Sequence, residues 1–294
     1  MTTAPSWELQ EGDQIAAERY ALQLLGGGHK YEAYLAFDEE LQSVVVAKLL
    51  RPHLVEEESA LRTMRAEAKA LTRLNHPVLL RCFAVEAGGP KPHLVLEHLE
   101  GPRLSTLLRR QRRLALEQVI PLGLQLSSAL HYMHRQQMVH LDVKPRNIIM
   151  GGPPRLIDLS VARSFDQARN AIESIGTDAY MAPEQCEPKL MGGMSPQSDV
   201  YGWGVTMYQA ITGVLPYPKY DADGEDAERF PQLHLDPLPL TPDTPPVLAE
   251  LVMSCLEKRP EMRPFQTDIG ERLEPFVAAL PRRIVLSRFR PRMR

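Results

Sequence analysis

Apolar and polar residues alternate, as in strands, over much of the first third of the chain. Over most of the rest, apolar residues recur every three or four positions, as in helices. Residues 20–50 hold three apolar runs separated by a glycine-rich turn and a polar turn, the pattern of an antiparallel strand meander. Residues 56–74 carry apolar side chains every three or four positions, which predicts one amphipathic helix that ends before Pro77. With a further hairpin over 82–97, residues 20–99 are expected to form a small β-rich lobe.

The next part of the chain, residues 100–276, predicts a larger and mainly helical lobe. Helical periodicity occupies the segments 104–111, 117–136, 198–213 and 247–256. Between the last two of these, prolines recur and acidic side chains cluster, which favours a surface loop over a docking site for basic partners. The fold class is therefore α+β, with two unequal lobes.

The composition is that of a globular protein that can bury a sizeable core, with 44% hydrophobic and 24% charged residues in a chain of 294. A formal net charge of −3 gives no global basic field, so no specific nucleic-acid partner is expected. Three widely spaced cysteines favour reduced thiols. The N-terminus lacks the regions of a signal peptide, and no apolar run approaches the ~20 residues that span a bilayer. We expect a cytoplasmic protein.

Four side chains with phosphate and metal chemistry lie near the middle of the chain. Asp142, Lys144 and Asn147 fall within six residues, and Asp158 follows eleven residues later between two apolar runs. The first carboxylate can deprotonate a hydroxyl and the ammonium can neutralise a moving phosphoryl group, while the carboxamide and the second carboxylate can hold Mg²⁺ through oxygen. Each residue alone is typical of a solvated loop, but the set at this spacing predicts phosphoryl transfer.

This stretch resembles the HRDxxxxN and DFG motifs of eukaryotic-type Ser/Thr protein kinases of the bacterial-like kind, and the roles above are those of that family. Two departures are visible, because Leu141 replaces the motif arginine and the second motif reads Asp158-Leu159-Ser160. The resemblance covers roughly residues 20–276 and implies the two-lobed kinase fold.

The resemblance also implies an ATP site in the small lobe. Val46-Ala47-Lys48 resembles the strand whose lysine reaches the ATP phosphates, and Glu67 is expected to pair with Lys48. The full set expected around the nucleotide is Leu25, Gly26, Gly27, Gly28, Ala33, Ala47, Lys48, Leu96, Glu97, Leu99 and Ile149. Lys48 and Glu67 are counted with Asp142 and Lys144 as catalytic residues, and Asn147 and Asp158 as ligands of Mg²⁺ or Mn²⁺.

The glycine-rich loop matches the family only in part. Gly26 and Gly28 align with its first two glycines, whereas Tyr31 stands at the third and Ala33 replaces the valine. We expect a tyrosine there to stiffen the loop tip and to weaken phosphate contacts without removing the pocket.

Two later motifs resemble structural parts of the family's large lobe. Residues 176–184 resemble the end of the activation loop of Ser/Thr kinases, and Arg263 is expected to form a buried bidentate pair with Glu184. Asp199 is expected to accept backbone hydrogen bonds from the catalytic loop.

The resemblance implies an ATP-dependent Ser/Thr kinase that acts on protein substrates. Lys144 and Thr177 favour Ser/Thr over Tyr specificity. Because Leu141 replaces the arginine that pairs with a phosphorylated activation loop in other members, activity is expected not to depend strongly on phosphorylation at Ser164, Ser174 or Thr177.

Two alternatives remain open. The departures at Tyr31, Ala33, Leu141 and Ser160 suggest a pseudokinase that binds or scaffolds, although every group that must touch phosphate, metal or hydroxyl is present. A small-molecule kinase has no need for the motif at 176–184.

Both ends of the chain fall outside the expected catalytic domain. Residues 1–19 form an N-terminal extension and residues 277–294 a basic tail with six arginines in its last fourteen positions. A disordered solubilising tail is favoured over contact with anionic lipid or nucleic acid.

Overall fold

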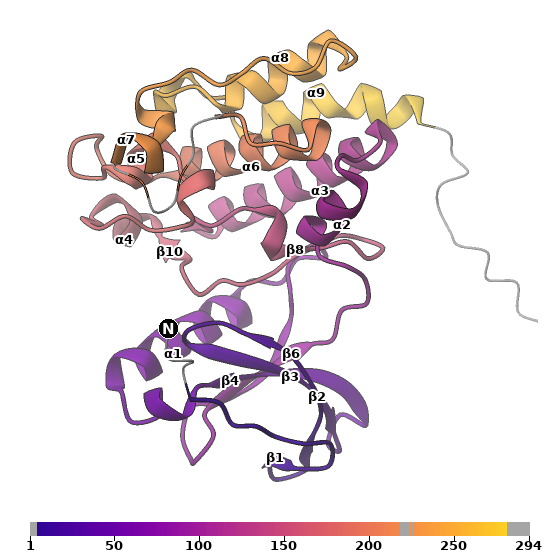
Figure 1. The fold of residues 1–294 in the computed structure, drawn as a ribbon, viewed down its shortest axis with the longest axis vertical. Helices are drawn as coiled ribbons and strands as arrows, with labels where there is room; N and C mark the ends of the chain where they lie inside the picture. Colours follow the sequence, from indigo (N-terminus) through magenta and orange to yellow (C-terminus); the bar gives the residue numbers. More distant parts are fainter. Residues whose placement is uncertain (1–4, 218–220, 222–223, 225, 281–294) are drawn as a thin grey trace, which may run out of the picture.

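The computed structural model of the protein describes residues 5–217, 221, 224 and 226–280. One lobe is a six-stranded antiparallel sheet with a helix beside it, at the bottom of Figure 1, and the other is mainly helical, at the top. The strand order in the sheet is β1-β2-β3-β4-β6-β5. The predicted two-lobed α+β fold is therefore confirmed.

The small lobe holds six strands and one long helix. They are β1 (Gln14–Ala16), β2 (Arg19–Gly27), β3 (Tyr31–Asp38), β4 (Ser43–Leu50), α1 (Glu58–Arg73), β5 (Cys82–Glu86) and β6 (His93–Glu97). Helix α1 buries the stripe of Met64, Ala68 and Leu71, as its periodicity predicts, and the buried Glu67 lies beside that stripe.

The two faces of the sheet pack into different clusters because side chains alternate along a strand. On β4, Val45, Ala47 and Leu49 are fully buried on one face. They pack in a cluster with Tyr34, Ala36 and Val95. Val46 and Lys48 therefore point to the opposite face, toward the large lobe.

The large lobe is built on α3 and α6, which lie side by side in its centre. Its helices are α2 (Leu104–Gln111), α3 (Leu116–Arg135), α4 (Phe165–Arg169), α5 (Pro183–Cys186), α6 (Pro196–Thr212), α7 (Asp226–Arg229), α8 (Pro246–Cys255) and α9 (Gln266–Ala279), and its short strands are β7 (Met138–Val139), β8 (Ile148–Ile149), β9 (Arg155–Leu156) and β10 (Arg163–Ser164). Trp203 of α6 is fully buried, and its indole nitrogen donates to the carbonyl of Gly123 on α3 at 3.0 Å. A Cβ at Gly123 would lie 3.1 Å from the Trp203 ring, so glycine lets the two helices approach closely.

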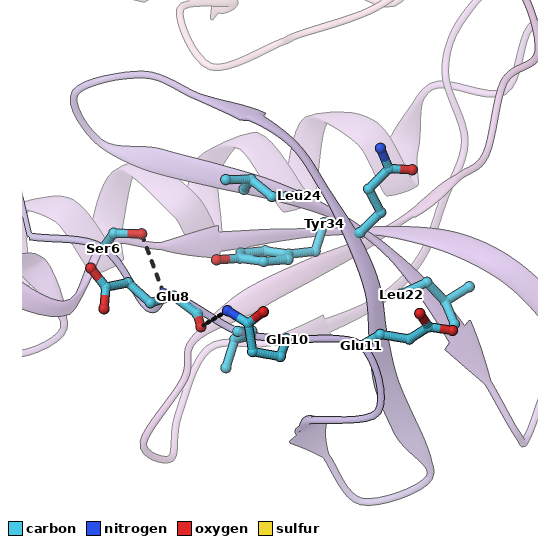
Figure 2. Close-up of a pocket in the computed structure, with 9 residues that line it drawn as sticks. Ser6, Glu8, Gln10, Glu11, Leu22, Leu24 and Tyr34 are labelled. Atoms are coloured by element: carbon cyan, nitrogen blue, oxygen red, sulfur yellow. Dashed lines mark hydrogen bonds between the residues drawn. The ribbon is translucent and has the colours of Figure 1, made fainter.

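The described part of the N-terminal extension packs on the small lobe. Strand β1 pairs with β2, and the Trp7 indole nitrogen donates to the carbonyl of Leu50 at 2.7 Å. Figure 2 shows the open pocket between this segment and β2, with Tyr34 at its base and Glu8 and Leu24 at its edges. This segment thus adds a strand and a side-chain anchor to the sheet.

The basic tail from residue 281 onward lies outside the described residues, as do Asp223 and Glu225 of the acidic cluster. Within the described part of the chain, none of the helices has the length and apolar character needed to cross a membrane.

Candidate active site

Three charged side chains from distant parts of the chain meet between the lobes. Lys48 Nζ on β4 lies 2.7 Å from Glu67 Oε1 on α1 and 3.1 Å from Asp158 Oδ1, two residues after β9. The large lobe supplies Asp158 and the small lobe the other two. The expected lysine–glutamate pair is therefore formed with the lobes closed on each other.

Burial and mutual attraction set the charge of this triad. Burial alone would lower the pKa of Lys48, because it disfavours the charged ammonium. The attraction of the Glu67 and Asp158 carboxylates is larger than this effect, so the Lys48 pKa is raised. Burial also raises the pKa of Asp158, yet Lys48 more than compensates and brings it to about 2. The pKa of Glu67 is raised, because the effect of its burial is larger than the opposing attraction of the Lys48 ammonium. Lys48 and Asp158 thus remain charged at neutral pH, as contact with phosphate and metal requires.

Asp142 is the centre of a second polar group in the large lobe. Its Oδ2 accepts from Lys144 Nζ at 2.7 Å and from Asn147 Nδ2 at 2.9 Å. Its Oδ1 accepts from the Thr177 hydroxyl at 2.7 Å, and Lys144 also bonds that hydroxyl. The Thr177 hydroxyl therefore links the segment at 176–184 to the Asp142 carboxylate and to Lys144.

The N-terminal turn of α6 holds the catalytic loop in place. Asp199 Oδ2 accepts from the His140 backbone at 2.8 Å and Oδ1 from the Leu141 backbone at 2.7 Å, as the sequence predicts. The backbone of Leu141 lies in the left-handed region, with a φ of 64°. A non-glycine residue in that conformation is strained, so the Asp199 bonds and the packing of the leucine must hold it there.

Asn147 and Asp158 suit a hard divalent cation. The Ile157 backbone donates to the Asn147 carbonyl at 2.8 Å, which places Asp158 one residue beyond the cross-strand partner of Asn147. The amide of Asn147 uses Nδ2 for both of its hydrogen bonds to Asp142, which leaves Oδ1 for a metal. A carboxamide oxygen beside an ionised carboxylate is the donor set that Mg²⁺ and Mn²⁺ prefer.

Ala47, which the sequence analysis placed in the nucleotide site, lies elsewhere. It is fully buried in the cluster on the far face of the sheet. Val46 shares the face of Lys48 and pairs with Leu96 on β6. Strict alternation, counted from Lys48, places Val46 rather than Ala47 on the face of the strand that carries Lys48.

The other expected nucleotide contacts flank the same gap between the lobes. Ala33 pairs directly with Lys48, so it lies on the same face of the sheet. Glu97 ends β6 and its Oε1 lies 3.1 Å from Arg155 of β9, which joins the lobes at the hinge. Leu99 packs against the main core, and Ile149 bridges to Arg103 below it.

The glycine turn joins β2 to β3 above this gap. Gly26 and Gly27 end β2, and the Gly28 backbone donates to the Tyr31 carbonyl at 2.8 Å to close the turn. Leu25 is 51% exposed. Tyr31 follows the turn as the first residue of β3, and Lys48 Nζ lies 4.6 Å from the centre of its ring.

The activation loop is tied to both the catalytic loop and the base of the lobe. Glu184 and Arg263 form the expected bidentate pair, at 2.7 and 2.9 Å, with both side chains fully buried. Gly176 has a φ of 129°, and a Cβ there would lie 2.7 Å from the Leu141 carbonyl. The loop therefore needs glycine at its closest approach to the catalytic loop.

This geometry agrees with the comparison to known families. The protein kinase domain matches residues 20–272 of this chain. The chain belongs to the protein kinase family. The Lys48–Glu67 and Glu184–Arg263 pairs are contacts that the motifs predicted.

Two groups of bacterial relatives are similar to this chain. The serine/threonine-protein kinase PknA of Mycobacterium tuberculosis is 33% identical over 255 residues, which cover 83% of this chain and 58% of that protein. The serine/threonine-protein kinase PknB of Mycolicibacterium smegmatis is 30% identical over 268 residues, or 86% of this chain and 42% of that protein. The chain thus spans about half the length of the curated relatives that it matches.

Proposed function

We propose that this chain is an ATP-dependent protein serine/threonine kinase, with its catalytic domain at residues 20–276 divided near residue 99. The observation that carries the proposal is the contact of Lys48 in the small lobe with Asp158 in the large lobe, because Asp158 follows the residue bonded to Asn147 and Asn147 in turn bonds Asp142. Lys48, held by Glu67, supplies the charge for nucleotide phosphates. Asp142, held with Thr177, supplies the base for a hydroxyl.

Each residue has a distinct part in this mechanism. Asp142 accepts the proton of the substrate hydroxyl and aligns its oxygen, and Lys144 neutralises charge on the transferred group. Asn147 and Asp158 would hold Mg²⁺ or Mn²⁺, which when bound neutralises phosphate charge. Pre-set hydrogen bonds fix these side chains, so little reorganisation is needed when substrate binds.

Protein substrates fit this site better than small metabolites. The segment 176–184 is anchored by Glu184 to Arg263, and by Gln185, whose Nε2 donates to the Leu141 carbonyl at 2.8 Å. An anchored segment beside Asp142 supports an extended peptide. The contacts of Lys144 and Thr177 with Asp142 agree with a Ser/Thr rather than a Tyr acceptor.

Independence from activation-loop phosphorylation has a physical basis in the packing of Leu141. The side chain is buried in a cluster with Val139, Ala168 and Met194. Phe165, Ala171 and Ile175 of the activation loop pack against that cluster. Apolar burial thus supplies the attachment that an arginine and a phosphate provide in other kinases.

Replacing Asp142 by Asn tests the proposal. The variant keeps the shape of the side chain but has no base, so we expect phosphotransfer to a protein substrate to fall by about 10³-fold or more, with Mg²⁺–ATP affinity within about threefold. Asp243→Asn, the same change at an exposed side chain that pairs with Arg113, is the matched control.

A pseudokinase is the second candidate, and the position of Tyr31 over Lys48 favours it. Wild-type protein that binds Mg²⁺–ATP but transfers no phosphate would establish this alternative. Activity undiminished in Asp142→Asn would remove the assignment of the base.

A further inference from the structure

The Tyr31 side chain covers the catalytic lysine from the side of the glycine turn. Its ring centre is 4.6 Å from Lys48 Nζ, within the range of a cation–π contact. Only 14% of the Lys48 side chain is exposed. Tyr31 begins β3 directly after the glycine turn, and the strand register places it on the same face of the sheet as Lys48. The ring therefore covers the ammonium on the face of the sheet where a nucleotide phosphate would reach Lys48.

The Tyr31 ring occupies the side of the Lys48 ammonium that its two carboxylate partners leave open. An ammonium group has three N–H donors. Glu67 and Asp158 take two of them. The remaining face of the ammonium is turned to the negative face of the Tyr31 ring. A phosphate oxygen and the ring therefore compete for the same face of Lys48.

The backbone around Tyr31 is fixed on several sides. The Arg51 backbone donates to the Lys30 carbonyl at 3.0 Å, and Arg51 Nε donates to the Gly28 carbonyl at 2.7 Å. The Arg51 guanidinium also lies 2.8 Å from Glu32. Because the turn is held down by these bonds, the ring leaves Lys48 by rotation of the Tyr31 side chain rather than by lifting of the whole turn.

The phenol group makes the covering position reversible. Its hydroxyl is buried and has no hydrogen-bond partner among the described residues. Burial, with the nearby Glu67 carboxylate, raises the pKa of Tyr31 to about 12, so the group is neutral at physiological pH. An unpaired buried hydroxyl opposes the cation–π attraction, and the ring is therefore held only moderately tightly.

We propose that Tyr31 is a gate on the phosphate site, whose ring must leave Lys48 before nucleotide phosphates can bind there. This inference rests on the proposed function, since it assumes that Lys48 receives phosphate. The gate lowers the affinity gained from phosphate groups and leaves the binding of the nucleoside part unchanged.

The size of the effect follows from the fraction of molecules in which the ring is displaced. Apparent affinity falls in proportion to that fraction. A cation–π contact at a largely desolvated lysine corresponds to roughly a tenfold preference for the covering position. We therefore expect removal of the ring to strengthen ADP and ATP binding by about tenfold.

The test compares nucleotides with and without phosphate. Calorimetry with Mg²⁺ gives dissociation constants for adenosine, ADP and ATP with wild type, Tyr31→Ser, Tyr31→Phe and Tyr20→Ser. Serine removes the ring without adding glycine's freedom, phenylalanine keeps the ring, and Tyr20 is a half-buried tyrosine on β2 of the same sheet. The ratio of the adenosine constant to the ADP constant measures the gain from phosphate.

The gate predicts that this ratio rises about tenfold in Tyr31→Ser. Tyr20→Ser should stay within about threefold of wild type, and Tyr31→Phe should stay at or below the wild-type ratio, because it keeps the ring and removes the unpaired hydroxyl. An equal or lower ratio in Tyr31→Ser would overturn the gate alone, and so would a rise in Tyr31→Phe matching that in Tyr31→Ser. No nucleotide binding by any of the four proteins would overturn the nucleotide site as well.

A second measurement uses only the wild-type chain and so does not depend on the folding of a variant. Nitration of Tyr31 by tetranitromethane, located by peptide mass spectrometry, should be slow without ligand and with adenosine, because the hydroxyl is buried. ADP should accelerate it by displacing the ring. Equal rates with ADP and adenosine would contradict the displacement.

Discussion

Leu141→Ala is expected to detach the activation loop from the catalytic loop. Leu141 is 3% exposed and contributes a branched side chain to a small cluster whose other members come largely from the activation loop. A buried Leu→Ala change costs about 2–5 kcal/mol, and a small cluster at the edge of a lobe belongs at the lower end. A loss of about 2 kcal/mol confined to the loop lowers the equilibrium constant for its attachment roughly thirtyfold.

Activity and proteolysis report this loss separately from global stability. The kcat/KM of unphosphorylated Leu141→Ala toward a protein substrate should fall well below the unfolding temperature, by at most about thirtyfold. Trypsin cleavage after Arg163, just before α4, and after Arg169, its last residue, should accelerate, again by at most about thirtyfold. Leu130→Ala is the matched control, because Leu130 on α3 is fully buried in the main core.

The control separates local from global destabilisation. Leu130→Ala should lower the urea midpoint at least as much as Leu141→Ala, while kcat/KM and trypsin cleavage of the activation loop stay near wild type. Equal activity and equal protease resistance in the two variants would refute the role of the cluster. So would a wild-type enzyme that is inert after phosphatase treatment and is rescued by rephosphorylation.

Two further predictions concern buried charge. Glu184→Gln leaves the buried Arg263 guanidinium uncompensated and should lower the free energy of unfolding by about 3–5 kcal/mol in urea titrations; a loss below about 1 kcal/mol would be inconsistent with that pair. Asp158, whose pKa is lowered to about 2, stabilises the fold above its unfolded pKa of 3.8 and loses that contribution as pH falls through 2. The stability difference between wild type and Asp158→Asn should therefore shrink between about pH 4 and pH 2, and a pH-independent difference would contradict the Lys48–Asp158 pair.

The sequence predicted the two lobes because each has its own periodicity. The apolar stripes of α1 and α3 specify buried helices, and the family resemblance predicted the pair of Lys48 and Glu67, which the structure forms. The sequence could not assign the faces of β4 in the same way. The strand is apolar almost throughout, so polarity gives no contrast, and only counting from Lys48 shows that Val46 rather than Ala47 faces the site.

Tertiary contacts without a local signal were also missed. The Trp7 anchor joins residues 43 positions apart, and β1 has only three residues, too few for a pattern. The direction of the Tyr31 ring depends on the attraction of Lys48, which is 17 positions away in the sequence. A motif comparison records a tyrosine in place of glycine but does not tell where its ring lies.

The backbone of Asp158 lies in the left-handed region, with a φ of 68°, at a residue that is proposed to hold metal. Glycine at position 158 would relieve strain of roughly 1–3 kcal/mol, but it would also remove the carboxylate that pairs with Lys48. Since these two effects offset each other, a laboratory library selected only for heat resistance should tolerate folded but inactive chains at that codon. Engineering a hardier form of this protein requires selection for turnover in every round.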